Sequence, residues 1–563
     1  MTRFLRSLGL LCAVALASCA PRGAQPIAYG TENCDYCRMT ISEPRFGAQV
    51  VTSTGKSRRF DSIECLASYY VEARSTGIVK SVWATDYRKP GHFISAEDAI
   101  YLRGGRAHSP MGLGLMAFSR SENAEALARE FGGVPMSWKD VLALVERASS
   151  SAVASHESHE QAANAGGNVD AITVSPDGEV RTVADAVSRA RAGGKIVVRR
   201  GVYREPTIVV DKPLEIVGDS GAVLDGGNDH QIMSVKADDV TIHGLTFRDV
   251  GVSYTEDRAA IKIAGVRRCT ITDNRVERGF FGIYLSAVED CRIERNVLVA
   301  TRGEEAGSGN GIHLWSSRRI TIAGNRVSGH RDGIYFEFVH DADVRDNDSE
   351  GNLRYGLHFM YSDSCRYVNN TFAGNTAGVA VMFTKHVDMI GNRFERNWGS
   401  ASYGLLLKEI YDSRLSDNVF SHNTVGLFAD GANRIHAEHN EFADNGWAVK
   451  LMASTQDGTF ERNTFVGNTF DVATNSRQSF TTFDGNYWDD YSGYDVNHDG
   501  VGDVPHRPVR LFSLVVEQNA PALILMRGLF VGLVDAAERV MPALTPETLV
   551  DQHPAMRPWG RLR

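Results

Sequence analysis

The sequence predicts two domains: a small α+β metal-binding domain, followed by an all-β right-handed parallel β-helix, which is a solenoid. Three observations predict this arrangement. Asparagine recurs about every 22 residues through the second half of the chain, and a stretch of small and polar residues at 149–168 precedes that repeat. The non-repeating first half holds the sulfur-rich stretch CDYCRM at 34–39. A chain of 563 residues also exceeds what one core usually serves.

The composition is that of a folded protein. Hydrophobic residues make up 43% and charged residues 23% of the chain, and 54 glycines supply turns. The formal net charge of -9 leaves no basic footprint, so we expect no nucleic-acid partner.

Residues 1–18 have the features of a lipoprotein signal peptide. Arg3 and Arg6 precede a short apolar run at 8–17, and the run ends in LASC, which resembles a bacterial lipobox. The apolar run is too short to span a bilayer. We therefore expect Cys19 to be the lipidated first residue of the mature protein; an uncleaved anchor or a chance match is the alternative.

The first domain, predicted at 19–148, contains Cys34, Cys37 and Met39 within CDYCRM. A CxxC pair in an exported protein suits a redox disulfide, half of a zinc site or a soft-metal site. Zinc normally needs a second cysteine pair, and the residues after the motif resemble a turn and strand rather than the helix of a redox motif. Thiolate plus thioether favours Cu(I). Further candidates are Met111 and Met116 in SPMGLGLMAF, Cys65 in FDSIEC, and His108.

Residues 149–168 lack apolar periodicity and predict a flexible linker. After it, the β-helix is predicted at 169–510. The stretch at 180–194 has the pattern of a short helix that caps the first coil of the solenoid.

The repeat consists of short apolar strands bounded by glycine, asparagine and aspartate. Successive asparagines are mostly 22 or 23 residues apart, with two longer steps of 29 and 26 where loops are inserted. Stacked coils place equivalent residues about 4.8 Å apart, so the asparagines are expected to form hydrogen-bonded ladders. A leucine-rich solenoid is the rival, but its helix-forming half is absent. The two series are Asn274, Asn296, Asn325, Asn347, Asn370, Asn392, Asn418, Asn440, Asn463 and Asn486, and then Asn352, Asn375, Asn397, Asn423, Asn445 and Asn468.

One outer face of the predicted coils carries soft ligands. Counting from the glycine of each unit, the first and third positions are apolar and point inward, so the second and fourth point outward. His358, Met360 and Met382 fall on these outward columns, with His313 two coils before His358. Sulfur with imidazole suits Cu(I), while packing under a loop or partner is an equal alternative.

Three later cysteines, Cys269, Cys291 and Cys365, fall in a column otherwise filled by small and apolar residues. They are most simply buried core thiols, although Cys269 and Cys291 lie on adjacent coils and can form a disulfide.

The segment DVNHDG resembles the start of a calcium loop. Its oxygen ligands are Asp495, Asn497, Asp499 and Asp503. The pattern fails at His506, where a bidentate glutamate is needed, so Asx turns explain the segment equally well.

The C-terminal segment, 511–563, contains an apolar run at 521–544 that also carries four charged residues. A membrane span is not expected. An amphipathic helix that docks on a membrane partner or caps the last coil fits better.

The first domain resembles the NosL family of copper-binding lipoproteins. The resemblance rests on the lipobox and on CDYCRMTI, RRFDSIECLASYY, SPMGLGLMAF and FGGVP. The repeats, GNYWDDYSGYDVNHDGVGDVPHRP and the C-terminal tail resemble NosD, the periplasmic β-helix accessory protein of nitrous oxide reductase. The chain is thus similar to a NosL–NosD fusion.

The resemblance implies a function. It implies a periplasmic, lipid-anchored protein, and not an enzyme, whose first half accepts Cu(I) and hands it to the second. The second half then works with an ABC transporter (NosF and NosY) to mature the copper centres of nitrous oxide reductase (NosZ). The family's ligands map onto Cys34, Cys37 and Met39, and onto Met111.

Two other functions compete with this one. Parallel β-helices often act on polysaccharides, but no acidic cluster recurs on neighbouring coils. A structural surface adhesin fits the solenoid but leaves the soft ligands unexplained.

Overall fold

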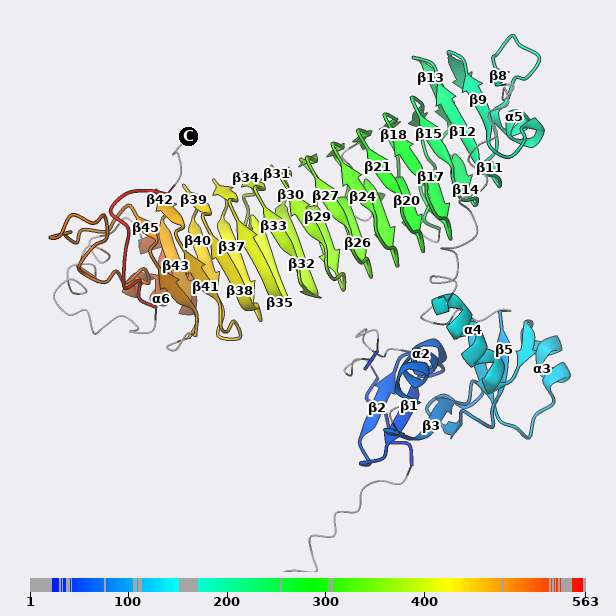
Figure 1. The fold of residues 1–563 in the computed structure, drawn as a ribbon, viewed down its shortest axis with the longest axis horizontal. Coiled ribbons are helices and arrows are strands. Elements are labelled where there is room, and N and C mark those ends of the chain that lie inside the picture. The colour runs from blue at the N-terminus through cyan, green and yellow to red at the C-terminus, as the bar shows by residue number, and fades with distance from the viewer. Residues whose placement is uncertain are drawn as a thin grey trace, which may run out of the picture. The chain divides into compact units, whose positions relative to one another are not determined.

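The computed structural model describes residues 23–29, 32, 34–36, 41, 43–74, 77–104, 109, 114–150, 171–253, 256–301, 303, 307–476, 480–525, 528, 531, 533–534, 537 and 549–559. The chain forms two compact units, Met1–Gly167 and Asn168–Arg563 (Figure 1). The predicted signal peptide, Cys19 and most of the linker lie outside the described residues.

The first unit is an α+β domain built on two antiparallel sheets. One sheet has the order β2-β1-β3-β4 and the other β6-β5-β7. The strands are β1 (Ala48–Thr52), β2 (Ser57–Phe60), β3 (Val79–Thr85), β4 (Phe93–Ser95), β5 (Ile100–Arg103), β6 (Leu115–Phe118) and β7 (Val134–Met136). The helices are α2 (Ile63–Ala73), α3 (Ala124–Phe131) and α4 (Trp138–Ser150). Helix α4 therefore extends two residues into the segment predicted as linker.

The core of the first unit joins α2 and α4 to strands of both sheets. Tyr101 of β5 and Trp138 of α4 pack with ring centroids 5.7 Å apart, and both are buried. Cys34 and Cys65 belong to the same buried cluster. Cys34 and Cys65 are thus part of the domain's core and not of an exposed loop.

The second unit is a parallel β-solenoid with three faces, as the repeat predicts (Figure 1). The first face contains β11 (Ile208–Val210), β14 (Met233–Val235), β17 (Ala259–Ala264), β20 (Phe281–Ser286), β23 (Ile312–Trp315), β26 (Asp332–Glu337), β29 (Tyr355–Met360), β32 (Ala377–Lys385), β35 (Leu405–Ser416), β37 (Val425–Asp430), β40 (Trp447–Leu451) and β43 (Phe470–Thr474).

The second face contains β8 (Ile172–Val174), β9 (Gly194–Val198), β12 (Leu214–Gly218), β15 (Thr241–His243), β18 (Thr270–Thr272), β21 (Arg292–Glu294), β24 (Thr321–Ala323), β27 (Asp343–Arg345), β30 (Arg366–Val368), β33 (Asp388–Ile390), β38 (Asn433–Glu438), β41 (Thr459–Glu461) and β44 (Thr482–Asp484). The long strand β35 also pairs along this face, with β33 and β38.

The third face is a 13-stranded parallel sheet. Its strands are β10 (Gly201–Tyr203), β13 (Ala222–Asp225), β16 (Thr246–Arg248), β19 (Arg275–Glu277), β22 (Val297–Val299), β25 (Arg326–Ser328), β28 (Asp348–Glu350), β31 (Thr371–Ala373), β34 (Arg393–Glu395), β36 (Val419–Ser421), β39 (Glu441–Ala443), β42 (Thr464–Val466) and β45 (Tyr487–Trp488).

Both predicted asparagine ladders are confirmed. In the longer one the amide of each asparagine donates to the next, as between Asn418 Nδ2 and Asn440 Oδ1 at 2.9 Å, and also to a backbone carbonyl. The shorter ladder starts at Asn352 and bonds in the same way to Asn375. Because each side chain satisfies backbone groups at a turn that is shielded from water, the ladders fix the register of the coils.

Inside the coils, aromatic side chains also stack in register. Phe394, Phe420 and Phe442 are parallel neighbours with centroids 4.7 Å apart. The inward positions predicted from the period of two are confirmed, since Ile283 and Leu285 are buried while Tyr284 between them is not.

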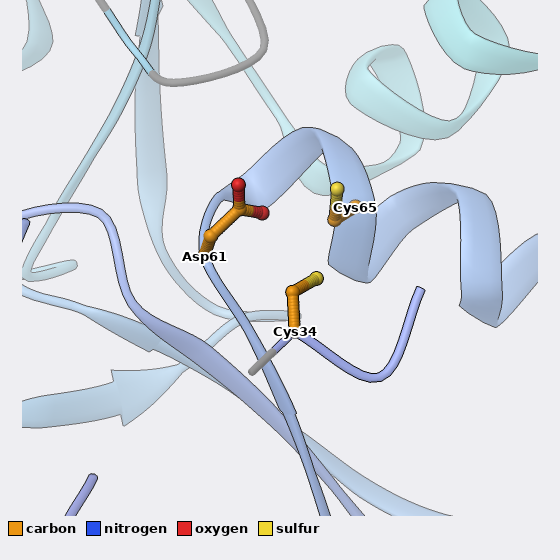
Figure 2. A group of neighbouring side chains, drawn as sticks. All are labelled: Cys34, Asp61 and Cys65. Carbon is orange, nitrogen blue, oxygen red and sulfur yellow. The ribbon is translucent and has the colours of Figure 1, made fainter. Parts of the chain in front are cut away.

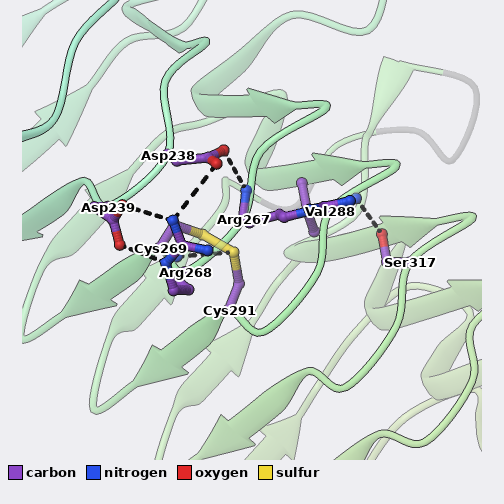
Figure 3. Close-up of a disulfide and its surroundings, with 8 residues drawn as sticks. All are labelled: Asp238, Asp239, Arg267, Arg268, Cys269, Val288, Cys291 and Ser317. Carbon is purple, nitrogen blue, oxygen red and sulfur yellow. Dashed lines mark hydrogen bonds and ion pairs between the residues drawn. A yellow bond between two sulfur atoms is a disulfide. The ribbon is translucent and has the colours of Figure 1, made fainter. Parts of the chain in front are cut away.

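The column of late cysteines is buried, as predicted. Cys269 and Cys291 form a disulfide that joins adjacent coils at the starts of β18 and β21, so they are not the free thiols of the simplest expectation (Figure 3). Cys365 remains a thiol, and burial raises its pKa to about 12.

Each end of the solenoid is capped. The predicted N-terminal helix is α5 (Val183–Arg189), and its Val183 and Val187 join the core. At the other end Asp551 is fully buried and closes the longer ladder by accepting from the backbone and side-chain nitrogens of Asn486.

The C-terminal segment also covers part of the first face. Helix α6 (Leu511–Gln518) and the 3₁₀ helix η3 (Ala520–Leu525) place Phe512 and Val516 against Phe470 of β43. Among the described residues no helix has the length and apolarity needed to cross a bilayer.

Candidate metal centre

A cluster of buried ligand atoms lies at the start of α2. Cys34, Asp61 and Cys65 each place one ligand atom within 4.8 Å of the other two (Figure 2). All three side chains are at most 2% exposed. The two sulfurs suit a soft cation, and the carboxylate adds a negative charge beside them.

Helix α2 explains the position of Cys65. Ser62 is its N-cap, and the Ser62 hydroxyl accepts a hydrogen bond from the Cys65 backbone nitrogen at 3.2 Å. Asp61 lies one residue before this cap, at the end of β2. The strand–cap–helix sequence FDSIEC thus directs Asp61 and Cys65 toward Cys34, which directly precedes a turn and lies 31 positions before Cys65 in the sequence.

Glu64 connects this helix start to a second segment. Its carboxylate accepts from the hydroxyl of Ser109, and that hydroxyl in turn accepts from the backbone nitrogen of Gly114 at 2.8 Å. Burial raises the pKa of Glu64. The two ends of the segment that carries Met111 are therefore held near α2.

Several predicted ligands of this domain lie outside the described residues, namely Cys37, Met39, Met111 and His108. Cys65 was one of several further candidates in the sequence, and the structure pairs it with Cys34. Asp61 was not predicted at all. Its position directly before a helix-capping serine, four residues from a cysteine, is the pattern that points to it. Met116 is buried in a separate hydrophobic cluster of the first unit.

The second candidate site is on the outer side of the first face. Met360 of β29 and Met382 of β32 are direct partners in the parallel register, and both are half-buried. His358 lies two residues before Met360 and is 9% exposed. Met360 and Met382 therefore lie in one column of the register, with Glu337 as its next member toward the N-terminus. Burial raises the pKa of Glu337.

His358 lies beside a buried ion pair. Its Nδ1 is 3.6 Å from Oδ2 of Asp332 and 3.3 Å from Nη2 of Arg354. The Asp332 side chain is fully buried. Burial alone would raise the Asp332 pKa, but hydrogen bonds from His358 and Arg354 outweigh it and the pKa is lowered.

His313 differs from His358, although the sequence groups them on one face. Its ring is stacked between Tyr284 and Tyr335, with centroids 4.4 and 4.7 Å away. Its Nδ1 is 3.0 Å from the side-chain nitrogen of Asn310. Burial lowers the pKa of His313 to about 3. His313 is thus packed into an aromatic stack and does not join the methionine column.

The predicted calcium loop is held by its own side chains. Asp495 accepts from the backbone nitrogens of Asp499 and Gly500, at 3.2 and 2.9 Å. Asp503 accepts from Val496 at 2.7 Å. Asn497 and Asp499 form Asx turns, because each accepts from the backbone nitrogen two residues further on, at 3.1 and 2.8 Å.

Comparison with known proteins finds matches for both units. Residues 28–144 match the NosL family model, and residues 299–493 match the model described as "Periplasmic copper-binding protein (NosD)". A protein of Pseudomonas aeruginosa named "Probable ABC transporter binding protein NosD" is 31% identical over 394 residues, which cover 66% of this chain and 90% of that protein. The chain belongs to the NosD family.

The first unit is similar to NosL proteins. The "Copper-binding lipoprotein NosL" of Stutzerimonas stutzeri is 26% identical over 158 residues, which cover 25% of this chain and 83% of the lipoprotein. The solved structure of the copper chaperone NosL from Shewanella denitrificans is 29% identical over 21% of this chain and 96% of that one, with a TM-score of 0.20. Both families are described as binding or accessory proteins and not as enzymes.

Proposed function

We propose that this NosL–NosD chain is a periplasmic, lipid-anchored copper(I)-binding protein that serves the maturation of nitrous oxide reductase. The observation that carries the proposal is the buried cluster of Cys34, Asp61 and Cys65 inside the NosL domain. Two sulfurs held this close favour a soft monovalent ion, because thiolates select Cu(I). The relatives of both units are described as copper-binding.

Copper is the cargo in this proposal, and the solenoid supplies a second site. His358, Met360 and Met382 offer an imidazole and two thioethers on neighbouring strands of one face. Thioethers bind Cu(I) more weakly than thiolates and, unlike thiols, release no proton on binding. A site of this kind suits an ion that is received and passed on, and the copper is proposed to move from the NosL domain to the NosD solenoid and then to the reductase (NosZ).

Covalent fusion of the two units serves this transfer. When donor and acceptor are on one chain, the second encounter is intramolecular and has a high effective concentration. An ABC transporter of the NosF/NosY type is proposed as the membrane partner, and the relatives named as ABC transporter binding proteins support it. Lipid on Cys19 would keep the protein at the membrane.

The decisive experiment is an anaerobic Cu(I) titration against a competing chelator, using the chain from residue 20 onward without lipid. Four proteins are compared: the parent, Cys34→Ser/Cys65→Ser, Met360→Ala/Met382→Ala, and the matched control Cys365→Ser. Cys365 is an equally buried thiol that lies in the solenoid core, outside both sites.

The expected result is tight binding lost in two steps, one step in each double variant, and unchanged binding in the control. If only the cysteine change matters, the solenoid is a docking scaffold and the second site is wrong. If neither double variant binds less copper than the parent, the copper-binding proposal itself fails.

A further inference from the structure

Strand β2 lies at the edge of its sheet, next to the thiol cluster. In the order β2-β1-β3-β4 it is the outermost strand, and it pairs with β1. Arg59 of β2 lies opposite Gln49 of β1 in the antiparallel register. An edge strand has backbone N–H and C=O groups that need partners from elsewhere. Another segment of the chain can therefore dock on this edge.

Asp35, which directly follows Cys34, takes both backbone groups of Arg59. The Asp35 backbone nitrogen donates to the Arg59 carbonyl oxygen at 2.7 Å, and Oδ2 of Asp35 accepts from the Arg59 backbone nitrogen at 2.8 Å. Oδ1 of Asp35 accepts from Nη1 of Arg58 at 2.8 Å. Both oxygens of this carboxylate are thus bonded to β2, one of them to a guanidinium in a charge-assisted bond.

A second carboxylate holds the chain on the other side of Cys34. Oε1 of Glu32 accepts from Nη1 of Arg59 at 2.7 Å, and Oε2 accepts from the backbone nitrogen of Ala28 at 3.0 Å. The Glu32 carbonyl oxygen accepts from the backbone nitrogen of Ile41 at 2.8 Å. Cys34 therefore lies between two carboxylates that are both bonded to β2.

The same strand leads into the other half of the cluster. Asp61 follows the end of β2, and Cys65 lies in the first turn of α2. Both side chains are close to Cys34 (Figure 2). Since Arg59 is two residues before Asp61, a bond to Arg59 fixes Cys34 relative to the segment that carries the other two ligand groups.

We infer that Asp35 is a positioning residue, which docks the Cys34 segment on the edge of β2 and so holds the Cys34 sulfur near Cys65 before the metal ion binds. The inference rests on the thiol site of the proposed function. A site that is assembled for only part of the time binds its ligand more weakly, in proportion to that fraction. Loss of groups that orient metal ligands typically lowers metal affinity by about 10–100-fold.

Hydrophobic packing is the alternative explanation for the position of Cys34. Cys34 is itself fully buried, and Ile27 and Ile41 anchor the chain on either side of it in the same core cluster. If packing alone fixes the sulfur, the loss of Asp35 has no effect on metal binding.

The two backbone bonds to Arg59 distinguish Asp35 from an ordinary surface residue. The ion pair of Asp35 with Arg58 is partly exposed, at 21% and 36% of the two side chains, and a pair of this kind contributes little on its own. The bonds to the Arg59 backbone, in contrast, add the Cys34 segment to the sheet edge. We expect these bonds to hold the segment in place.

The test uses the chain from residue 20 with Cys37→Ser and Met360→Ala/Met382→Ala, so that neither a neighbouring thiol nor the solenoid competes for copper. This protein is the test chain. Its Cu(I) affinity is measured anaerobically by chelator competition. The same measurement is made after adding Asp35→Ala, Cys34→Ser, or both changes together.

The matched control is Asp98→Ala. Asp98 also pairs with an arginine of the same domain, Arg120, at 3.2 Å, but both side chains are exposed. Hydrogen exchange of the copper-free proteins, followed by mass spectrometry, is the second measurement. The amides of residue 35 and Arg59 are expected to exchange faster in Asp35→Ala, while those of β3 exchange as in the test chain.

The expected result is an affinity lower by about 10–100-fold in Asp35→Ala, an unchanged affinity in the control, and no further loss when Asp35→Ala is added to Cys34→Ser. Asp35 has no effect there because the sulfur that it positions is gone. An unchanged affinity in Asp35→Ala overturns the inference. An equal loss with and without Cys34, or faster exchange throughout the domain, also overturns it, because Asp35 then acts on the fold as a whole.

The proposed function fails in a different way. If Cys34→Ser and Cys65→Ser each bind Cu(I) as tightly as the test chain does, the thiol cluster is not the copper site, whatever Asp35→Ala does to hydrogen exchange at β2.

Discussion

The two candidate copper sites are built by different means. In the NosL domain, Cys34 directly precedes a turn and Cys65 lies in a helix, and only the tertiary fold brings their sulfurs together. In the solenoid, Met360 and Met382 are adjacent because they hold the same place in successive coils. One site depends on packing around a core, whereas the other depends on register.

This difference decides how each site fails. A register is held by many equal bonds along the ladders, so a single surface change leaves it intact and only a defect in a ladder or cap disturbs it. A packed cluster has no such redundancy, since each ligand comes from its own segment.

Removing the cap of the longer ladder is expected to have the largest effect. Asp551 accepts hydrogen bonds from the Asn486 side chain at 3.0 Å and from the Trp488 indole nitrogen at 3.1 Å, besides backbone nitrogens. Asp551→Ala leaves several buried donors unpaired, at about 1–3 kcal/mol each. We expect the solenoid to lose about 4 kcal/mol or more, measured by urea unfolding, while the NosL domain unfolds as before.

The control for this prediction is Asp177→Ala, an exposed aspartate in a turn at the other end of the solenoid. If the two variants unfold alike, the cap does not hold the register.

A buried histidine makes the solenoid sensitive to acid. His330 is fully buried and lies directly before Asn352 in the shorter ladder. Its backbone nitrogen donates to Oδ1 of Asn352. Burial lowers its pKa to about 4, from about 6.5 in the unfolded chain. Unfolding therefore takes up a proton between these two values, so stability is complete above about pH 6.5 and falls as the pH drops to 4.

His330→Asn places an asparagine in the shorter ladder, as at its other positions. Between pH 7 and pH 4 the parent is expected to lose about 3 kcal/mol of stability because of His330, and the variant is expected to keep it. Urea unfolding at a series of pH values measures the difference. A parallel pH profile in parent and variant would contradict the assignment of the acid response to His330.

The next prediction separates the sequence motif from the folded cluster. The motif CDYCRM emphasises Cys37, whereas the structure pairs Cys34 with Cys65. We expect Cys65→Ser to weaken Cu(I) binding at the NosL-like domain by at least about 100-fold. That is the upper end of the loss of metal affinity seen when a residue that only supports a ligand is replaced, about 100-fold. Chelator competition measures it, with Cys365→Ser as control. A smaller effect in Cys65→Ser than in Cys37→Ser would favour the motif.

The same contrast explains what the sequence could predict. The solenoid, both ladders and the inward columns followed from a period that is visible in single residues such as Asn418 and Leu285. The capping helix followed from the local pattern of residues 180–194. The alignment of Met360 with Met382 was predicted too, because the position of a residue within its repeat gives its strand register. The sequence could not show that Cys34 lies close to Asp61 and Cys65, since their proximity depends on the tertiary packing of one segment against a helix.

Even where the register was predicted correctly, the sequence did not predict which contacts the side chains make. Cys269 and Cys291 were placed correctly on adjacent coils, but only the packed core decides between two thiols and a disulfide. His313 and His358 hold equivalent positions, yet one is stacked between tyrosines and the other lies against a carboxylate. The groups near the two Nδ1 atoms also differ: Asn310 lies at that of His313, whereas Asp332 and Arg354 lie at that of His358.

The smallest effect is expected at the loop that resembles a calcium site. Its carboxylates already accept backbone hydrogen bonds, as Asp495 does from Gly500 at 2.9 Å, so a cation must displace bonds that stabilise the turn. A weak extracellular site, with a dissociation constant of about 0.1–1 mM, would stabilise the solenoid by about 0.4–1.4 kcal/mol at about 1 mM Ca²⁺. We expect less than about 0.4 kcal/mol, by calorimetry with and without chelator. A larger shift that disappears in Asp499→Ala would show that the loop binds calcium and that an ion, and not register alone, completes this part of the solenoid.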